Sequence, residues 1–113
     1  MIRGVGVDAV GVARMRRALE RTPRLAERVF TARELATASE RASREASLAA
    51  RFAAKEATRK ALGATIAWRD VEVVSSEDRV PTLRVAGHEG VRFHVSLTHT
   101  DDVAIAVVLA EAP

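Results

Sequence analysis

The spacing of apolar residues changes at about Trp68, and this change limits the folds that the chain can adopt. Before it, apolar side chains recur at helical intervals, as at Val12, Met15 and Leu19. After it, apolar and polar residues alternate in short segments of the kind that form strands, at 71–74, 82–85, 91–97 and 103–109. Helices followed by strands predict an α+β fold in which an antiparallel sheet packs against helices.

Two of the expected strands carry additional information. Residues 103–110 are apolar on both faces, so this strand is expected to lie inside the sheet. Near the start of the chain, the apolar segment 2–7 is interrupted by Gly4 and Gly6, which indicates that another part of the backbone approaches it closely. We expect this first strand to end at Asp8.

Three shorter helices are expected between the first strand and the middle of the chain. The first begins near Val12, and the pair Thr22-Pro23 is expected to end it, with Thr22 as the cap of a second short helix and Pro23 in that helix's first position. A third helix opens near Thr31, where the residues TARE have the form of a capping box.

The longest helix is expected over residues 48–62, which are rich in alanine. Ser47 is a suitable N-cap, and Gly63 stands where a C-terminal glycine belongs. The preceding residues 41–45 are polar enough to be a loop.

The composition, 48% hydrophobic and 29% charged, is typical of a folded soluble protein, and a length of 113 residues predicts one domain over 1–113. The chain has no Cys, so a metal would need oxygen or histidine ligands. The opening residues MIRGVGVD do not resemble a signal peptide and no apolar run is long enough to span a membrane, so we expect a cytoplasmic protein. Most of the 18 Lys and Arg residues lie in the first half, which favours phosphate or acidic protein partners.

Two carboxylates, Asp8 and Glu56, are candidates for a metal site. Glu56 falls on the helix face that carries Phe52, where it can either pair with Lys60 at i+4, worth about 0.2–0.5 kcal/mol, or bind a metal. Asp8 can cap the following helix or turn, or bind the same metal. Two carboxylates suit Mg²⁺, which takes one or two from a protein and completes its shell with waters and substrate phosphates.

Four cations surround Glu56 in the sequence, and two interpretations of them stay open. They are Arg51, Lys55, Arg59 and Lys60. They form either a solvated basic face or a shell of phosphate-binding groups. His99, beside the Asp101-Asp102 turn, is either a surface turn residue or part of a site.

Three sequence blocks resemble the acyl-carrier-protein synthase family of 4'-phosphopantetheinyl transferases, in the order in which that family has them. They are GVGVDAV at 4–10, SLAARFAAKEATRKALGA at 47–64 and FHVSLTHTDDVAIAVVL at 93–109. The resemblance implies transfer of phosphopantetheine from coenzyme A (CoA) to a serine of an apo-acyl carrier protein, on the fold expected above. It also implies a homotrimer with active sites between subunits.

The same resemblance implies roles for individual residues. Asp8 and Glu56 would hold Mg²⁺ against the diphosphate of CoA, and Lys60 would contact the phosphates or the reacting hydroxyl as the third catalytic residue. His99, Arg51 and Arg44 would lie near the nucleotide end of CoA.

Five arginines recur at intervals of three and four residues and form a basic ridge on the first helices: Arg14, Arg17, Arg21, Arg24 and Arg28. The ridge is either a solubilising face or, as the resemblance implies, a docking surface for the carrier, with Arg14 in the leading position and Arg21 and Arg24 beside it.

Two alternative functions remain open. One is the same chemistry on the carrier of a polyketide or multidomain synthase. The other is a small basic nucleic-acid-binding module, which is less favoured because the few aromatic residues are widely spaced and offer no platform for stacking bases.

Overall fold

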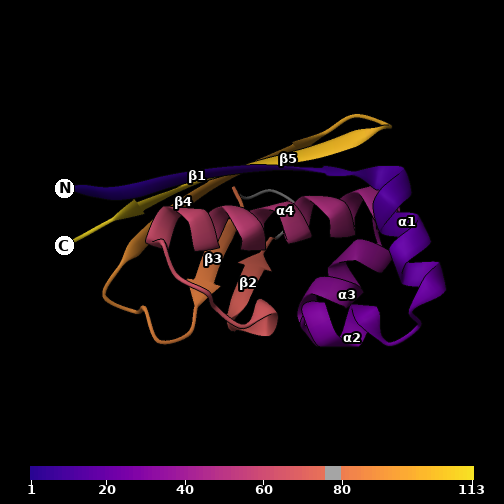
Figure 1. Cartoon of the computed structure of the whole chain (residues 1–113), viewed down its shortest axis with the longest axis horizontal. Coiled ribbons are helices and arrows are strands. Elements are labelled where there is room, and N and C mark those ends of the chain that lie inside the picture. Colours follow the sequence, from indigo (N-terminus) through magenta and orange to yellow (C-terminus); the bar gives the residue numbers. More distant parts are fainter. Residues whose placement is uncertain (76–79) are drawn as a thin grey trace.

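The computed structural model describes residues 1–75 and 80–113, which form helices packed on antiparallel sheets (Figure 1). The elements follow one another as β1 (Ile2–Gly11), α1 (Val12–Arg21), α2 (Leu25–Val29), α3 (Ala32–Ser39), α4 (Arg44–Leu62), the 3₁₀ turn η1 (Trp68–Asp70), β2 (Val71–Val74), β3 (Thr82–Val85), β4 (Arg92–His99) and β5 (Val103–Glu111). The expected α+β fold with antiparallel sheets is therefore confirmed.

The strands form two sheets. One has the order β1-β5-β4 and the other is the hairpin β2-β3, and all pairings are antiparallel. β5 lies between its two neighbours, as its apolar character on both faces predicted. Helix α4 lies along the three-stranded sheet, and α1, α2 and α3 gather at one end of it (Figure 1).

The contact between β1 and α4 is unusually close, as the glycines in β1 predicted. A Cβ atom at Gly4 would lie 1.9 Å from the carbonyl oxygen of Ala61, and one at Gly6 would lie 1.9 Å from that of Ala57. Any side chain at these two positions would therefore push strand and helix apart. Small residues of α4 and β5 complete this layer of the core.

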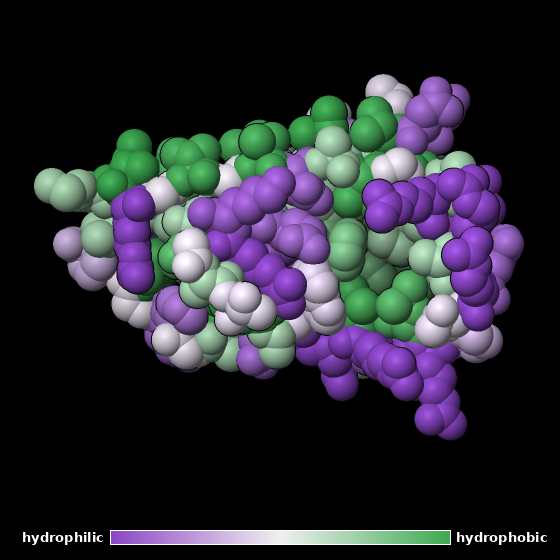
Figure 2. Space-filling model, in the orientation of Figure 1, coloured by the Kyte–Doolittle hydropathy of each residue, from purple (hydrophilic) through white to green (hydrophobic). Residues whose placement is uncertain are grey.

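The opposite face of the three-stranded sheet leaves apolar side chains in solvent. Ile2, Val5 and Val7 of β1 are more than half exposed, at 59, 58 and 54%, and Val107 of β5 is 42% exposed. Figure 2 shows hydrophobic residues along the edge of the molecule where β1 runs. These side chains form a neighbouring group of exposed apolar residues on one face of the sheet.

Two boundaries in the first part of the chain differ from the expectation. Asp8 was expected at the end of a strand, but β1 continues to Gly11 because its pairing with β5 extends to Gly11 opposite Val103. Thr22 does not cap α2. It is the C-cap of α1, with its N–H bonded to the carbonyl of Ala18, and Arg24 holds the N-cap position of α2.

The start of the long helix also differs. α4 begins at Arg44 rather than Leu48, because Ser43 caps it by accepting a hydrogen bond from the N–H of Ala46. The expected C-terminal glycine is confirmed, since Gly63 adopts the left-handed conformation with φ 63°. The capping box at Thr31 is confirmed as well.

No helix among the described residues combines the length and hydrophobicity that crossing a bilayer requires.

Candidate active site

Asp8 and Glu56 line one cavity of about 400 Å³. Asp8 comes from β1 and Glu56 from α4, and the glycines of β1 let these two elements approach closely enough for both carboxylates to reach the same hollow. Arg14 of α1 lies at the same cavity, whose remaining walls are apolar and include Met15 and Phe52. Figure 2 shows the hollow as a recess of hydrophobic residues beside the hydrophilic side chains of α1.

Lys60 extends this group of charges. Its Nζ donates to Asp8 Oδ1 at 3.2 Å and to the carbonyl oxygen of Val7 at 3.0 Å. The pair is partly open to solvent, with the Lys60 side chain 55% exposed and that of Asp8 20% exposed. Lys60 therefore reaches β1 rather than Glu56, and within the described ranges Glu56 has no ion pair.

The donor set at this cavity fits a hard cation that brings most of its own ligands. No cluster of three or more His, Cys, Asp or Glu side chains suited to a metal occurs in the described part of the chain, so the protein does not build a closed metal cage there. The two carboxylates of Asp8 and Glu56 match the way Mg²⁺ is commonly held, by one or two carboxylates together with substrate phosphates and water.

A second cavity, of about 720 Å³, brings together Arg51 and His99. His99 is the last residue of β4 and is exposed, and its Nδ1 lies 3.3 Å from the carbonyl oxygen of Thr100. Arg51 is only 4% exposed. Burial lowers the pKa of its guanidinium from the usual value, Glu34 opposes that shift, and Arg41, another residue of the cavity wall, reinforces it.

Arg44 is not among the residues that line this cavity. It is exposed in the first turn of α4, while Arg41, three residues earlier, does line the cavity. The sequence offered no reason to prefer Arg41, because both residues fall in a segment that was expected to be a loop.

Lys55 is not a phosphate-binding group, contrary to one interpretation of the sequence. Its side chain is fully buried and its Nζ donates to Glu34 Oε1 at 2.7 Å, to the carbonyl of Trp68 at 3.0 Å and to the carbonyl of Val71. Burial lowers the pKa of Lys55 and the adjacent Glu34 opposes that shift. All three ammonium donors are used inside the fold.

The sequence did not indicate that Glu34 is a buried charged residue. Its carboxylate also accepts hydrogen bonds from the N–H groups of Thr31 and Val73, so it joins α3, α4 and β2. The capping-box pattern located Glu34 correctly at the start of α3, but that pattern concerns the hydrogen bonds of the first helical turn and does not indicate burial.

Arg59 is also committed to the fold. Its guanidinium stacks on Trp68 at 3.3 Å from the ring centroid and donates to the carbonyl of Ile66. The interpretation of all four cations around Glu56 as a phosphate shell is therefore wrong for Lys55 and Arg59. Of the four, Arg51 lines the second cavity, and Lys60 bonds to Asp8, which lines the first.

The basic ridge is divided between two elements. Arg14, Arg17 and Arg21 are exposed on α1, whereas Arg24 and Arg28 follow the turn at Pro23 and belong to α2 and its N-cap. Of the five arginines, Arg14 alone is among the residues that line the cavity of Asp8 and Glu56.

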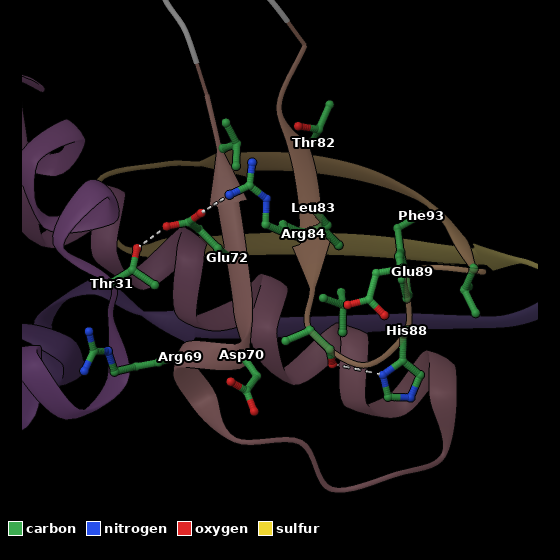
Figure 3. Close-up of a pocket in the computed structure, with 14 residues that line it drawn as sticks. Thr31, Arg69, Asp70, Glu72, Thr82, Leu83, Arg84, His88, Glu89 and Phe93 are labelled. Carbon is green, nitrogen blue, oxygen red and sulfur yellow. Dashed lines mark hydrogen bonds and ion pairs between the residues drawn. The ribbon is translucent and has the colours of Figure 1, made fainter.

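A third hollow lies beside the β2-β3 hairpin and contains no residue that the sequence singled out as functional (Figure 3). Within it, Thr31 Oγ1 donates to Glu72 Oε2 at 2.6 Å, and Arg84 lies 3.7 Å from the other oxygen of Glu72. Acidic and basic groups are mixed along its wall, so it has no single charge preference.

Comparison with known proteins shows the family to which the chain belongs. Residues 4–108 match the family model of the 4'-phosphopantetheinyl transferase superfamily. The chain is 51% identical to a holo-[acyl-carrier-protein] synthase of Streptomyces griseus, over 98% of this chain and 99% of the relative. It is 47% identical to the synthase of the same name from Salinispora arenicola, over 98 and 99%.

Solved structures show the same fold. The holo-(acyl-carrier-protein) synthase of Bacillus anthracis, crystallised with CoA (3',5'-ADP), has a TM-score of 0.87 at 30% identity and covers 100% of this chain and 99% of its own. The acyl carrier protein synthase of Mycobacterium tuberculosis has a TM-score of 0.83 at 35% identity, with both chains covered fully. The chain therefore belongs to the 4'-phosphopantetheinyl transferase superfamily, in its holo-[acyl-carrier-protein] synthase family.

Proposed function

We propose that the chain transfers the 4'-phosphopantetheine group of CoA to a serine of an apo-acyl carrier protein, with Asp8, Glu56 and Lys60 as its catalytic residues. One observation carries this proposal: the side chains of Asp8 and Glu56 line the same cavity, and the ammonium of Lys60 donates a hydrogen bond to Asp8. Family membership supports the reaction, and the geometry supports the choice of residues.

The proposed site works by placing charge around a diphosphate. Asp8 and Glu56 would hold Mg²⁺, which supplies positive charge to the phosphate oxygens as negative charge builds up on the 3',5'-ADP leaving group. Lys60 is half exposed, so its ammonium can turn from Asp8 toward a phosphate oxygen without breaking a buried contact. Arg51 and His99 would bind the nucleotide end of CoA, together with Arg41 of the same cavity wall. Arg44, in the first turn of α4, is proposed to assist them.

The positions of the two cavities support the proposal of a homotrimer with active sites between subunits. Arg51 and Glu56 are five residues apart on α4, which places their side chains about 140° apart around the helix axis. One protomer therefore presents its two sets of CoA-binding groups in different directions. The exposed apolar face of β1 and β5 would provide the contact between subunits. Sedimentation equilibrium should give three times the mass of the 12.2 kDa chain.

The carrier is proposed to dock on the exposed arginines Arg14, Arg21 and Arg24. Arg14 supports this placement because it lies both on the exposed ridge and at the cavity of Asp8 and Glu56. Changing Arg14 and Arg21 to Glu should raise the KM for the carrier and weaken its dependence on ionic strength, with the KM for CoA nearly unchanged. Unchanged carrier kinetics would place the docking surface elsewhere.

The activity is tested by incubating the protein with CoA, Mg²⁺ and an apo-acyl carrier protein and measuring the mass of the carrier. We expect the phosphopantetheine mass increment, which should disappear when the metal is chelated and return when Mg²⁺ is restored. A carrier that gains no mass, together with salt-sensitive binding to DNA that ignores CoA, would favour the nucleic-acid alternative.

Three further points stay predictions. They are that residues 1–113 form a single domain, that the protein is cytoplasmic, and that its carrier is a free acyl carrier protein rather than a carrier domain of a polyketide or multidomain synthase. Parallel assays with both kinds of carrier decide the last point, through the ratio of their kcat/KM values.

A further inference from the structure

The guanidinium of Arg51 is held on two sides by serine hydroxyls. Its Nη1 donates to Ser47 Oγ at 2.6 Å, and more weakly to the carbonyl of Ser47 at 3.3 Å, while its Nη2 donates to Ser75 Oγ at 2.8 Å. Ser47 lies one turn earlier on α4, and Ser75 directly follows β2. Both serines, like Arg51, line the second cavity.

Hydroxyl oxygens are unusual partners for a buried guanidinium. Arg51 is 4% exposed, yet no carboxylate among the described residues lies within ion-pair distance of it, and its Nε is a buried donor with no partner there. Burying a cation without a counter-ion costs free energy, which a bound anion would return. Neutral partners fix the direction of the guanidinium without neutralising its charge.

We infer that Ser47 and Ser75 are positioning residues, which hold the guanidinium of Arg51 in the orientation that binds an anionic group of CoA. This inference rests on the proposed nucleotide-binding role of Arg51. The two serines come from separate elements, so they fix Arg51 relative to both α4 and the end of β2. Arginine otherwise loses considerable rotamer freedom when it is held by a ligand, and a side chain fixed beforehand loses less on binding.

The test compares Ser47→Ala and Ser75→Ala with Ser39→Ala, whose hydroxyl donates to the carbonyl of Ala36 at the exposed end of α3. Each of the first two changes should raise the KM for CoA, and the Kd for 3',5'-ADP measured by calorimetry, by about threefold to tenfold, because each removes one hydrogen bond to a charged group. The kcat and the KM for the carrier should stay near those of the parent protein. Ser39→Ala should change none of these values.

Two controls separate positioning from a general effect on folding. Ser75→Thr keeps a hydroxyl and should restore most of the affinity. In an Arg51→Ala background, which should itself weaken CoA binding, Ser75→Ala should add no further loss, because a residue that acts through Arg51 has nothing left to position. Melting temperatures establish that each variant is folded, and calorimetry reads binding even where turnover is low.

Three results would overturn the inference. If both alanine variants bind CoA like the parent while Arg51→Ala weakens binding, the serines do not position Arg51. If Ser75→Ala still lowers affinity in the Arg51→Ala background, it acts by another route. If Arg51→Ala leaves CoA binding unchanged, the nucleotide-binding role of Arg51 fails, and the inference fails with it, whereas the roles of Asp8 and Glu56 remain standing.

Discussion

Two neighbouring faces of α4 use similar charged residues for different purposes. One face carries Arg51, Lys55 and Arg59, spaced by four residues, and each of these cations bonds to the segment 66–75. The adjacent face carries Glu56 and Lys60, which lie toward β1 and the first cavity. The first face holds η1 and β2 against the helix, and its Arg51 also lines the second cavity. The second face leaves the charge of Lys60 accessible to a ligand.

Burial and hydrogen bonding separate the two faces more clearly than residue type does. Lys55 has no exposed surface and three acceptors, so its charge is fully used within the protein. Lys60 is 55% exposed and can exchange its partner on β1 for another. A lysine in the first environment is expected to control stability, and a lysine in the second to control activity.

The largest expected effect comes from Lys55→Met, which leaves the buried carboxylate of Glu34 without its cation. We expect a loss of about 3–5 kcal/mol in the free energy of unfolding, measured by urea denaturation. Lys60→Met is the matched control, because it removes an exposed pair worth at most about 1 kcal/mol. Equal stability losses in the two variants would show that the two faces do not differ.

The pair itself is isolated by adding Glu34→Gln to Lys55→Met. Glutamine keeps an oxygen that can accept a hydrogen bond from the N–H groups of Thr31 or Val73 but carries no charge. The double variant should therefore be more stable than Lys55→Met alone. If it is less stable, the uncompensated charge is not the cause of the loss.

Glu56→Gln should have the next largest effect, and on activity instead of stability. It keeps the size of the side chain while removing one charge from the proposed metal site, so transfer should fall by about 100-fold or more, most strongly at limiting Mg²⁺, while the melting temperature stays close to that of the parent. Asp8→Asn should behave in the same way. Glu40→Gln, at the exposed end of α3, serves as the control.

The sequence predicted the fold in most of its parts because the relevant signals are local. Alternating apolar residues located β2 and β3 at their exact bounds, and the apolar 103–110 segment predicted the central strand. The errors occurred where two local signals compete. Ser43 and Ser47 are both good N-caps, and their backbone conformations decide which one caps α4.

The site was predictable only in part, because the two faces of α4 differ in tertiary contacts that the spacing of residues in the sequence does not reveal. The structure brings Asp8 and Glu56 to one cavity, and their role as metal ligands stays a prediction from residue chemistry and from the family resemblance. Nothing in the spacing of Lys55 and Lys60 distinguishes a buried cation from an exposed one. The distinction arises from Glu34, which is 21 residues away in the chain.

A third test addresses the close approach that brings Asp8 toward Glu56. Gly6→Ala places a methyl group 1.9 Å from the backbone oxygen of Ala57, where no flexible side chain can move away. Strand and helix must separate, which should cost about 1–3 kcal/mol in stability and also reduce transfer. Gly90→Ala, which meets no atom within 4 Å, should change neither property.

The smallest effect is expected from Arg59→Met, at the C-terminal end of the structural face. The guanidinium stacks 3.3 Å from the Trp68 ring centroid and bonds to the Ile66 carbonyl, so its removal should lower the free energy of unfolding by about 1 kcal/mol. Methionine keeps apolar contact with the indole, which limits the loss. The KM for CoA should not change, since Arg59 is committed to η1 and not to either cavity. A lower stability with an unchanged KM for CoA would show that the structural role of this face continues to the last turn of α4. A changed KM for CoA with unchanged stability would contradict this, because Arg59 would then act in ligand binding.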